Sequence, residues 1–133
     1  MTNPNTNKQP SVLLVEDSPA QALKTKVTLE NNGCQVHWAK TGLDGLTMAL
    51  QNTFDLIVLD IELPDITGFE VCKKLKANPE LANVPVIMLT SLDQAENALD
   101  GLEAGAIDYI PKDAFADVVL VETIKQMNVM NSK

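Results

Sequence analysis

The sequence predicts an α/β fold in which a parallel sheet of five strands carries helices on both faces. Five short apolar segments alternate along the chain with segments of helical periodicity, an order typical of a doubly wound sheet. Within the expected strand 55–60, residues 56–59 are all apolar and show no alternation, as expected of a central strand that is covered on both sides. The 133 residues suit one domain and are too few for an eight-stranded α/β barrel.

Start and stop signals in the sequence predict where the individual helices and strands lie. The first helix is expected to begin at Ser18 and Pro19, an N-cap followed by a proline at the first helical position, and to stop at Gly33. Its apolar positions are Ala22, Leu23, Val27 and Leu29. The expected strands are 11–16, 34–39, 55–60, 84–90 and 107–110. The other helices are expected to start at Thr41–Gly42, at Thr67–Gly68, at Ser91 and at Asp113–Ala114, the last running to about Met127.

The chain divides into three parts by composition. Residues 1–10 are rich in Asn and Thr and predict a disordered N-terminal tail, residues 11–128 predict one folded domain, and residues 129–133 predict a C-terminal tail. The opening segment lacks the apolar core of a signal peptide, and no apolar run is long enough to cross a membrane. We therefore expect a cytoplasmic protein that does not engage a membrane.

The charge of the chain argues against nucleic-acid binding. Acidic residues outnumber basic ones by 18 to 10, which gives a formal net charge of −8. All the basic residues are lysines, so bidentate guanidinium contacts with phosphate are not available. The two cysteines, Cys34 and Cys72, lack the spacing of a metal site, and we expect reduced thiols in or near the core.

Three carboxylates are placed where two expected strands end. Glu16 and Asp17 follow the apolar run 12–15, and Asp60 follows the apolar run 56–59. If these strands are neighbours, the three side chains converge at the carboxyl edge of the sheet, where open α/β sheets bind their ligands. Such a cluster has to be neutralised, protonated or bound to a hard cation, and Mg²⁺ is the expected ion.

Thr90 and Lys112 are expected just past strand ends on the same edge. With a cation in place, Asp60 can attack a phosphoryl group as a nucleophile and form an aspartyl phosphate. Lys112 offers a compact positive charge to the phosphoryl oxygens, and the Thr90 hydroxyl can donate to another of these oxygens. The pattern permits catalysis by positioning and charge neutralisation.

These motifs, in this order, resemble the receiver domain of two-component response regulators, in particular the stand-alone chemotaxis type called CheY. The resemblance covers about residues 11–127 and implies a flavodoxin-like sheet with the strand order 2-1-3-4-5. Each motif alone is weak, whereas the ordered set at strand ends is specific. The matching segments are Leu14–Ser18, Leu59–Asp60 with Pro64 and Gly68, Leu89–Ser91, and Tyr109–Lys112.

The resemblance assigns a role to each site residue. Asp60 would be the phosphoacceptor, while Asp17 would bind Mg²⁺ directly and Glu16 would bind it through water. Glu62 would contribute its backbone carbonyl to the metal. Lys112 would be the phosphate-binding lysine, and Thr90 would carry the switch hydroxyl. Tyr109 would be the aromatic residue that swings inward.

The resemblance also implies partners. The phosphoryl group would come from a sensor histidine kinase or a phosphotransfer protein, and a downstream effector protein would bind the rearranged output face. That face would include residues 93–103 and 114–125, from the fourth helix to the last. The chain would act as a signalling switch rather than as an enzyme, as a monomer or weak dimer, and by analogy in motility or taxis.

Two positions near the expected site are particular to this chain and bear on its chemistry. The family usually has proline after the lysine, whereas Asp113 follows Lys112 here and Pro111 precedes it. Asp113 adds a negative charge beside the lysine or caps the last helix. Glu62 lies two residues past Asp60, and we hypothesise that its charge alters the lifetime of the aspartyl phosphate.

Three other functions compete with this interpretation. A receiver-like module could dock without phosphate. A phosphatase or mutase with an aspartyl nucleophile would usually carry that residue after the first strand, with a second Asp two positions on, and Glu16–Pro19 lacks this spacing. A flavin-binding domain would need an anion-binding loop there, and Glu16 and Asp17 repel an anion.

Overall fold

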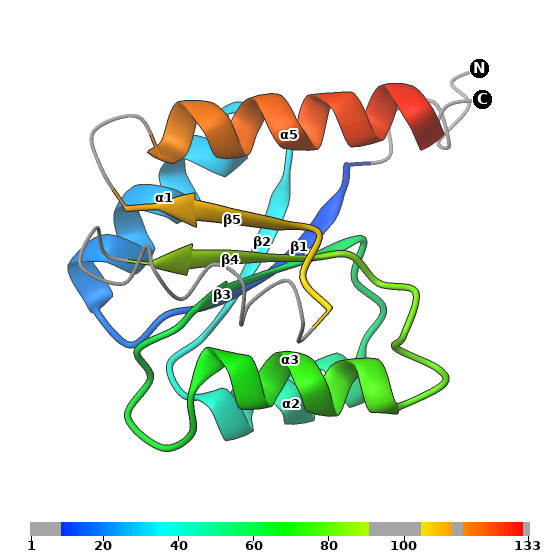
Figure 1. Ribbon diagram of the computed structural model, residues 1–133. Helices are drawn as coiled ribbons and strands as arrows, with labels where there is room; N and C mark the ends of the chain where they lie inside the picture. The colour runs from blue at the N-terminus through cyan, green and yellow to red at the C-terminus, as the bar shows by residue number, and fades with distance from the viewer. Residues whose placement is uncertain (1–8, 91–104, 113–115, 132–133) are drawn as a thin grey trace.

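The computed structural model describes residues 9–90, 105–112 and 116–131. Five parallel strands form one sheet in the order β2-β1-β3-β4-β5, which confirms the predicted fold class and strand order (Figure 1). The strands are β1 Ser11–Val15, β2 Gln35–Ala39, β3 Leu56–Asp60, β4 Val86–Thr90 and β5 Asp108–Pro111. The helices are α1 Pro19–Asn31, α2 Gly42–Gln51, α3 Gly68–Ala77 and α5 Ala116–Asn131. The expected helix over 91–104 lies outside the described residues.

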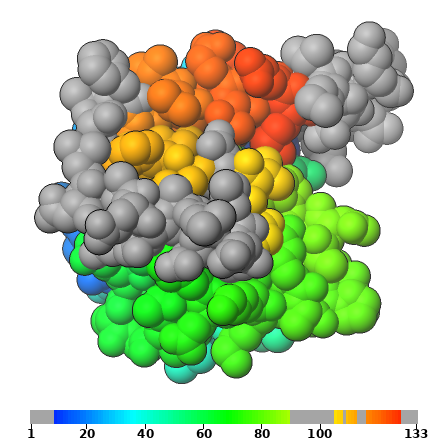
Figure 2. All heavy atoms as spheres, in the orientation of Figure 1, coloured from blue at the N-terminus to red at the C-terminus, as the bar shows by residue number. Residues whose placement is uncertain are grey.

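Helices cover both faces of the sheet. The side chains of one face pack with α1 and α5, and those of the other face pack with α2 and α3. Figure 1 shows α5 above the strands and α2 and α3 below them, and Figure 2 shows α5 and α3 at opposite sides of the molecule. All five residues of β3 are buried, as predicted for a central strand without alternation.

Three helices begin at the residues that the sequence indicated. The hydroxyls of Ser18, Thr41 and Thr67 each accept a hydrogen bond from the backbone N–H three residues later. These caps satisfy donors that a helix leaves unpaired at its start. The last helix is longer than predicted and ends at Asn131 instead of near Met127. No glycine or proline follows Met127, so no local signal stops the helix there.

The apolar residues of α1 are divided between the core and the surface. Ala22 and Leu29 of α1 are buried together with Thr25, whereas Leu23 is 63% exposed and Val27 is also exposed. The spacing 22, 25, 29 follows one face of a helix, and this face alone meets the sheet. Both cysteines, Cys34 and Cys72, are buried thiols of the core, as expected.

No helix among the described residues combines the length and the apolar character needed to cross a membrane.

Candidate functional site

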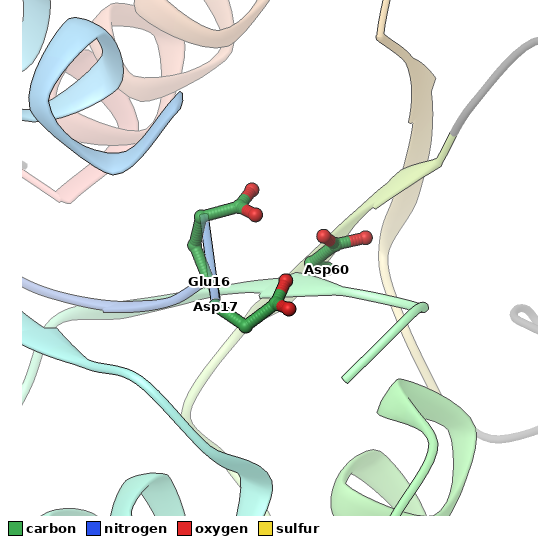
Figure 3. A group of neighbouring side chains, drawn as sticks. All are labelled: Glu16, Asp17 and Asp60. Carbon is green, nitrogen blue, oxygen red and sulfur yellow. The ribbon is translucent and has the colours of Figure 1, made fainter. Parts of the chain in front are cut away.

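The carboxyl ends of β1 and β3 bring three carboxylates together. The strands are direct neighbours and Val15 pairs with Leu59, so Glu16 and Asp60 leave the sheet side by side. Glu16, Asp17 and Asp60 each place one carboxylate oxygen within 4.8 Å of the others (Figure 3). Glu16 and Asp60 are only 1% and 4% exposed, whereas Asp17 is exposed. The convergence predicted from the two strand ends is therefore present.

Glu16 is fixed through its backbone and its side chain. Its N–H donates to the Ala39 carbonyl at 3.0 Å, which continues the pairing of β1 with β2 by one residue. The Trp38 indole Nε1 donates to the Glu16 carbonyl oxygen at 2.6 Å. The carboxylate accepts the Ser18 N–H at 3.2 Å, immediately before α1 starts. Glu16 thus ties β1, β2 and the beginning of α1 together.

The loop after β3 closes tightly against Asp60. One carboxylate oxygen of Asp60 accepts the Glu62 N–H at 3.1 Å, and the Ile61 N–H donates to the Leu89 carbonyl of β4. The Gly68 N–H donates a hydrogen bond to the Ile61 carbonyl at 2.9 Å, so the start of α3 lies against the end of β3. A Cβ on Gly68 would collide with the Asp60 carbonyl oxygen, which explains a glycine at this position.

Asp65 anchors the same loop from its far side. Its two carboxylate oxygens accept the backbone N–H groups of Gly42 and Leu43, at 2.9 and 2.8 Å. These groups belong to the first turn of α2, where a negative charge is favourable. Although slight burial acts to raise the pKa of Asp65, these hydrogen bonds outweigh it and hold the pKa below its usual value. The sequence analysis missed this contact.

Lys112 joins the two buried carboxylates. It follows β5, and its Nζ lies 2.9 Å from Glu16 Oε1 and 2.7 Å from Asp60 Oδ2. Burial acts to lower the pKa of Lys112, but the bonds to Asp60 and Glu16 outweigh it, and the pKa is raised above its ordinary value. The residue following the lysine, Asp113, lies outside the described residues. The Lys112 ammonium group thus lies at the acidic cluster, on the edge of the sheet where the sequence predicted it.

One lysine does not balance the charge of this cluster. Burial raises the pKa of Glu16 to about 7, and the neighbouring Asp60 charge adds to the shift although Lys112 opposes it. With all three carboxylates ionised, the group formed by Glu16, Asp17, Asp60 and Lys112 has a net charge of −2. Crowded oxygen donors with an excess of negative charge are the donor set of a hard divalent cation, so these residues fit Mg²⁺.

The other predicted residues are placed as follows. Thr90 ends β4 on the same edge and pairs with Pro111, but its side chain lies outside the described part of the chain. Tyr109 is half-buried on β5 and packs with the core of the α2 and α3 face. Glu62 follows Asp60 with an exposed side chain. The hydrogen bond from Trp38 to Glu16 was not predicted, although Trp38 lies one residue before the end of β2, at this edge of the sheet.

The fold and this edge define a flavodoxin-like α/β domain of the CheY-like class. The chain matches the response regulator receiver domain over residues 12–125 and belongs to this family. It is 35% identical over 109 residues to Protein PilH of Pseudomonas aeruginosa, and this match covers 82% of this chain and 90% of that protein. The structure of the chemotaxis response regulator CheY4 of Vibrio cholerae superimposes with a TM-score of 0.82 at 29% identity, over 90% of this chain and 98% of that one.

A relative with a different architecture is also similar. The chain is 39% identical over 103 residues to RpaA of Synechocystis sp., a DNA-binding dual master transcriptional regulator. The match covers 77% of this chain but only 43% of RpaA, so the chain spans less than half of that relative. Membership of the family therefore leaves the effector of this chain open.

Proposed function

We propose that the protein is a phosphorylation-dependent signalling switch in which Asp60 accepts a phosphoryl group from a histidine kinase or a phosphotransfer protein. The observation that carries the proposal is the position of Asp60: a buried carboxylate at a strand end, next to Glu16 and Asp17 and bonded to Lys112. A nucleophile, a cation site and a phosphate-binding amine are the three parts that this transfer needs.

The carboxylates of Asp17 and Asp60 would hold Mg²⁺ directly, with Glu16 acting through water and Glu62 through its backbone carbonyl. When bound, the cation neutralises the carboxylates and the phosphoryl oxygens, so that an anionic donor can approach. The crowding of the three carboxylate oxygens within 4.8 Å of one another supports this assignment. Family membership supports it as well.

In the transfer itself, a carboxylate oxygen of Asp60 attacks the phosphorus of a phosphohistidine donor. An O–P bond forms, the N–P bond breaks, and the imidazole nitrogen leaves with the bonding electron pair. Lys112 already lies 2.7 Å from an Asp60 oxygen and has only to turn toward the phosphoryl oxygens. Thr90 would donate its hydroxyl to one of these oxygens, since β4 ends beside β3 on this edge.

Phosphorylation would act by shifting an equilibrium between two conformations. It adds charge and acceptor oxygens at the edge, and movement of Thr90 with Tyr109 would carry the change to the output face. Of that face, the described part includes β5 and the residues of α5 up to Lys125. We propose a protein as the effector rather than nucleic acid, because the chain carries a net charge of −8.

The setting that we propose is motility or taxis. The support is the similarity to CheY4, a chemotaxis response regulator of which this chain covers nearly the whole length. The chain itself would turn over only its own phosphoryl group, which distinguishes a switch from a phosphatase. An enzyme would instead release phosphate continuously from a small phosphate ester.

Intact mass after incubation with Mg²⁺ and a small phosphodonor tests the proposal. The wild type should gain one phosphoryl group, and Asp60→Asn should gain none. Asp44→Asn, an exposed acidic residue in the first turn of α2, is the matched control and should gain it normally. Wild type that binds Mg²⁺ but gains no mass would contradict the proposal and favour a docking module that works without phosphate.

A further inference from the structure

The side chain of Trp38 reaches the candidate metal site from the neighbouring strand. Its indole N–H donates to the Glu16 carbonyl oxygen at 2.6 Å, the shortest of the hydrogen bonds described around this residue. The contact joins the end of β2 to the turn that carries Glu16 and Asp17. Neither the function proposed above nor the metal assignment makes use of Trp38.

This hydrogen bond completes the anchoring of Glu16. The Glu16 N–H is held by the Ala39 carbonyl, and its carboxylate oxygens are held by the Ser18 N–H and by Lys112. The Glu16 carbonyl oxygen belongs to the peptide that links Glu16 to Asp17. Since a peptide group is planar, fixing this oxygen also fixes the N–H and the direction in which the chain enters Asp17.

Trp38 is itself well placed to act as an anchor. Its ring is half-buried and packs against the core cluster on the α1 and α5 face. The Lys40 ammonium lies 5.8 Å from the ring centroid, within the range of a cation–π contact. The packing and the cation–π contact therefore restrict the orientation in which the indole N–H donates. A rigid donor positions its acceptor more closely than a flexible one.

We propose that Trp38 is a positioning residue for divalent-cation binding, which acts by fixing the peptide between Glu16 and Asp17. The inference rests on the proposed function, because it assumes that these carboxylates bind Mg²⁺. Asp17 is exposed and would otherwise sample many directions relative to Asp60. The hydrogen bond from Trp38 reduces this freedom before the ion arrives, so that less conformational entropy is lost when the ion binds.

The proposal also makes Trp38 a reporter of the site. It is the only tryptophan in the chain, so the intrinsic indole emission comes from this position. Its N–H bonds to the peptide that leads to a metal-binding carboxylate, and a bound cation changes the field at that peptide. Emission should change during a Mg²⁺ titration with the same midpoint as binding measured by calorimetry.

The test compares Mg²⁺ binding by wild type and Trp38→Phe, measured by calorimetry. Phenylalanine retains an aromatic ring but has no N–H, and loss of one hydrogen bond should weaken binding about three- to tenfold. His37→Phe is the matched control, since it replaces a neighbouring ring of β2 that packs on Phe54 and should leave binding unchanged. With a phosphodonor, Trp38→Phe should need more Mg²⁺ for half-maximal rate but reach the wild-type rate at saturation.

A second substitution separates the N–H from the packing of the ring. Benzothienylalanine at position 38 has nearly the shape of tryptophan with sulfur in place of the N–H, and it should show the same weakened binding. Equal Mg²⁺ affinity of wild type and this isostere would overturn the inference while leaving the proposed function intact. A wild type that binds no Mg²⁺ in calorimetry would overturn both.

Discussion

Charge is arranged in opposite ways at the carboxyl edge of the sheet and on the outer surfaces of the helices. At the edge, Lys112 lies within 2.9 Å of two buried carboxylates. On the helices, the pairs Lys26–Glu30 and Lys125–Glu122 have N–O distances of 3.8 Å, and all four side chains are at least 40% exposed. The edge concentrates charge away from water, whereas the helices leave it in water.

The difference indicates that the charges at the edge serve function, whereas the exposed pairs contribute little to stability. Exposed pairs gain little free energy, because water and salt screen them. Burying like charges raises the free energy of the folded state, as the raised pKa of Glu16 indicates. A protein retains such an arrangement where the charges do chemistry, and perturbed carboxylates in a cluster are typical of functional sites.

The largest effect on stability is expected from Lys112→Met. The substitution leaves Glu16 and Asp60 buried without their cation, and it should lower the free energy of unfolding in EDTA by about 2–3 kcal/mol. This is less than for a fully buried pair, because the Lys112 side chain is 20% exposed. Urea unfolding at pH 8 measures it, and Mg²⁺ should recover part of the loss.

Lys125→Met is the matched control for Lys112→Met. It removes a lysine from an exposed pair on α5 and should leave the urea midpoint nearly unchanged. Similar losses for the two variants would mean that the edge and the helix surface do not differ in the way described above.

Gly68→Ala should produce the next largest effect, because the new Cβ would collide with the Asp60 carbonyl oxygen and lie 2.9 Å from Ile61 Cα. Backbone atoms cannot move aside cheaply, so we expect a loss of about 1–3 kcal/mol and slower phosphorylation of Asp60. Gly45→Ala is the comparison, since its Cβ meets the Val15 side chain rather than backbone atoms. An equal loss in both variants, measured by thermal unfolding, would argue against backbone crowding at Asp60.

Asp65→Asn should have a smaller effect of about 1 kcal/mol, because an amide accepts less strongly from the Gly42 and Leu43 N–H groups and loses the favourable charge. Asp44→Asn, in the first turn of the same helix, removes only a charge and should lose less. Urea unfolding of both variants, at neutral pH and low salt, checks this order. If Asp44→Asn were the more damaging change, the anchor assigned to Asp65 would be wrong.

Lys26→Gln is expected to have the smallest effect. It removes an exposed i,i+4 pair with Glu30 on α1, and the free energy of unfolding should change by less than about 0.5 kcal/mol. The change should also disappear at high salt, unlike the effect of Lys112→Met in EDTA. Parallel urea titrations at low and high salt provide the measurement.

The alternation of strands and helices could be predicted from the sequence alone, because apolar periodicity and local caps act over a few residues. Ser18 with Pro19 marked the start of α1, and the apolar run before Asp60 marked β3. The carboxylates at strand ends were also visible, since parallel strands deliver their carboxyl ends to one edge. The strand order came from resemblance, and the structure confirmed it.

Contacts between residues far apart in the chain could not be predicted and became visible in the folded structure. Lys112 bridges two carboxylates that precede it by 96 and 52 residues, Trp38 bonds to Glu16, and Asp65 holds the start of α2. Likewise, only packing against the sheet decided that Leu23 lies at the surface while Thr25 is buried. Such contacts depend on side-chain directions and distances across the assembled sheet, which no local pattern of residues records.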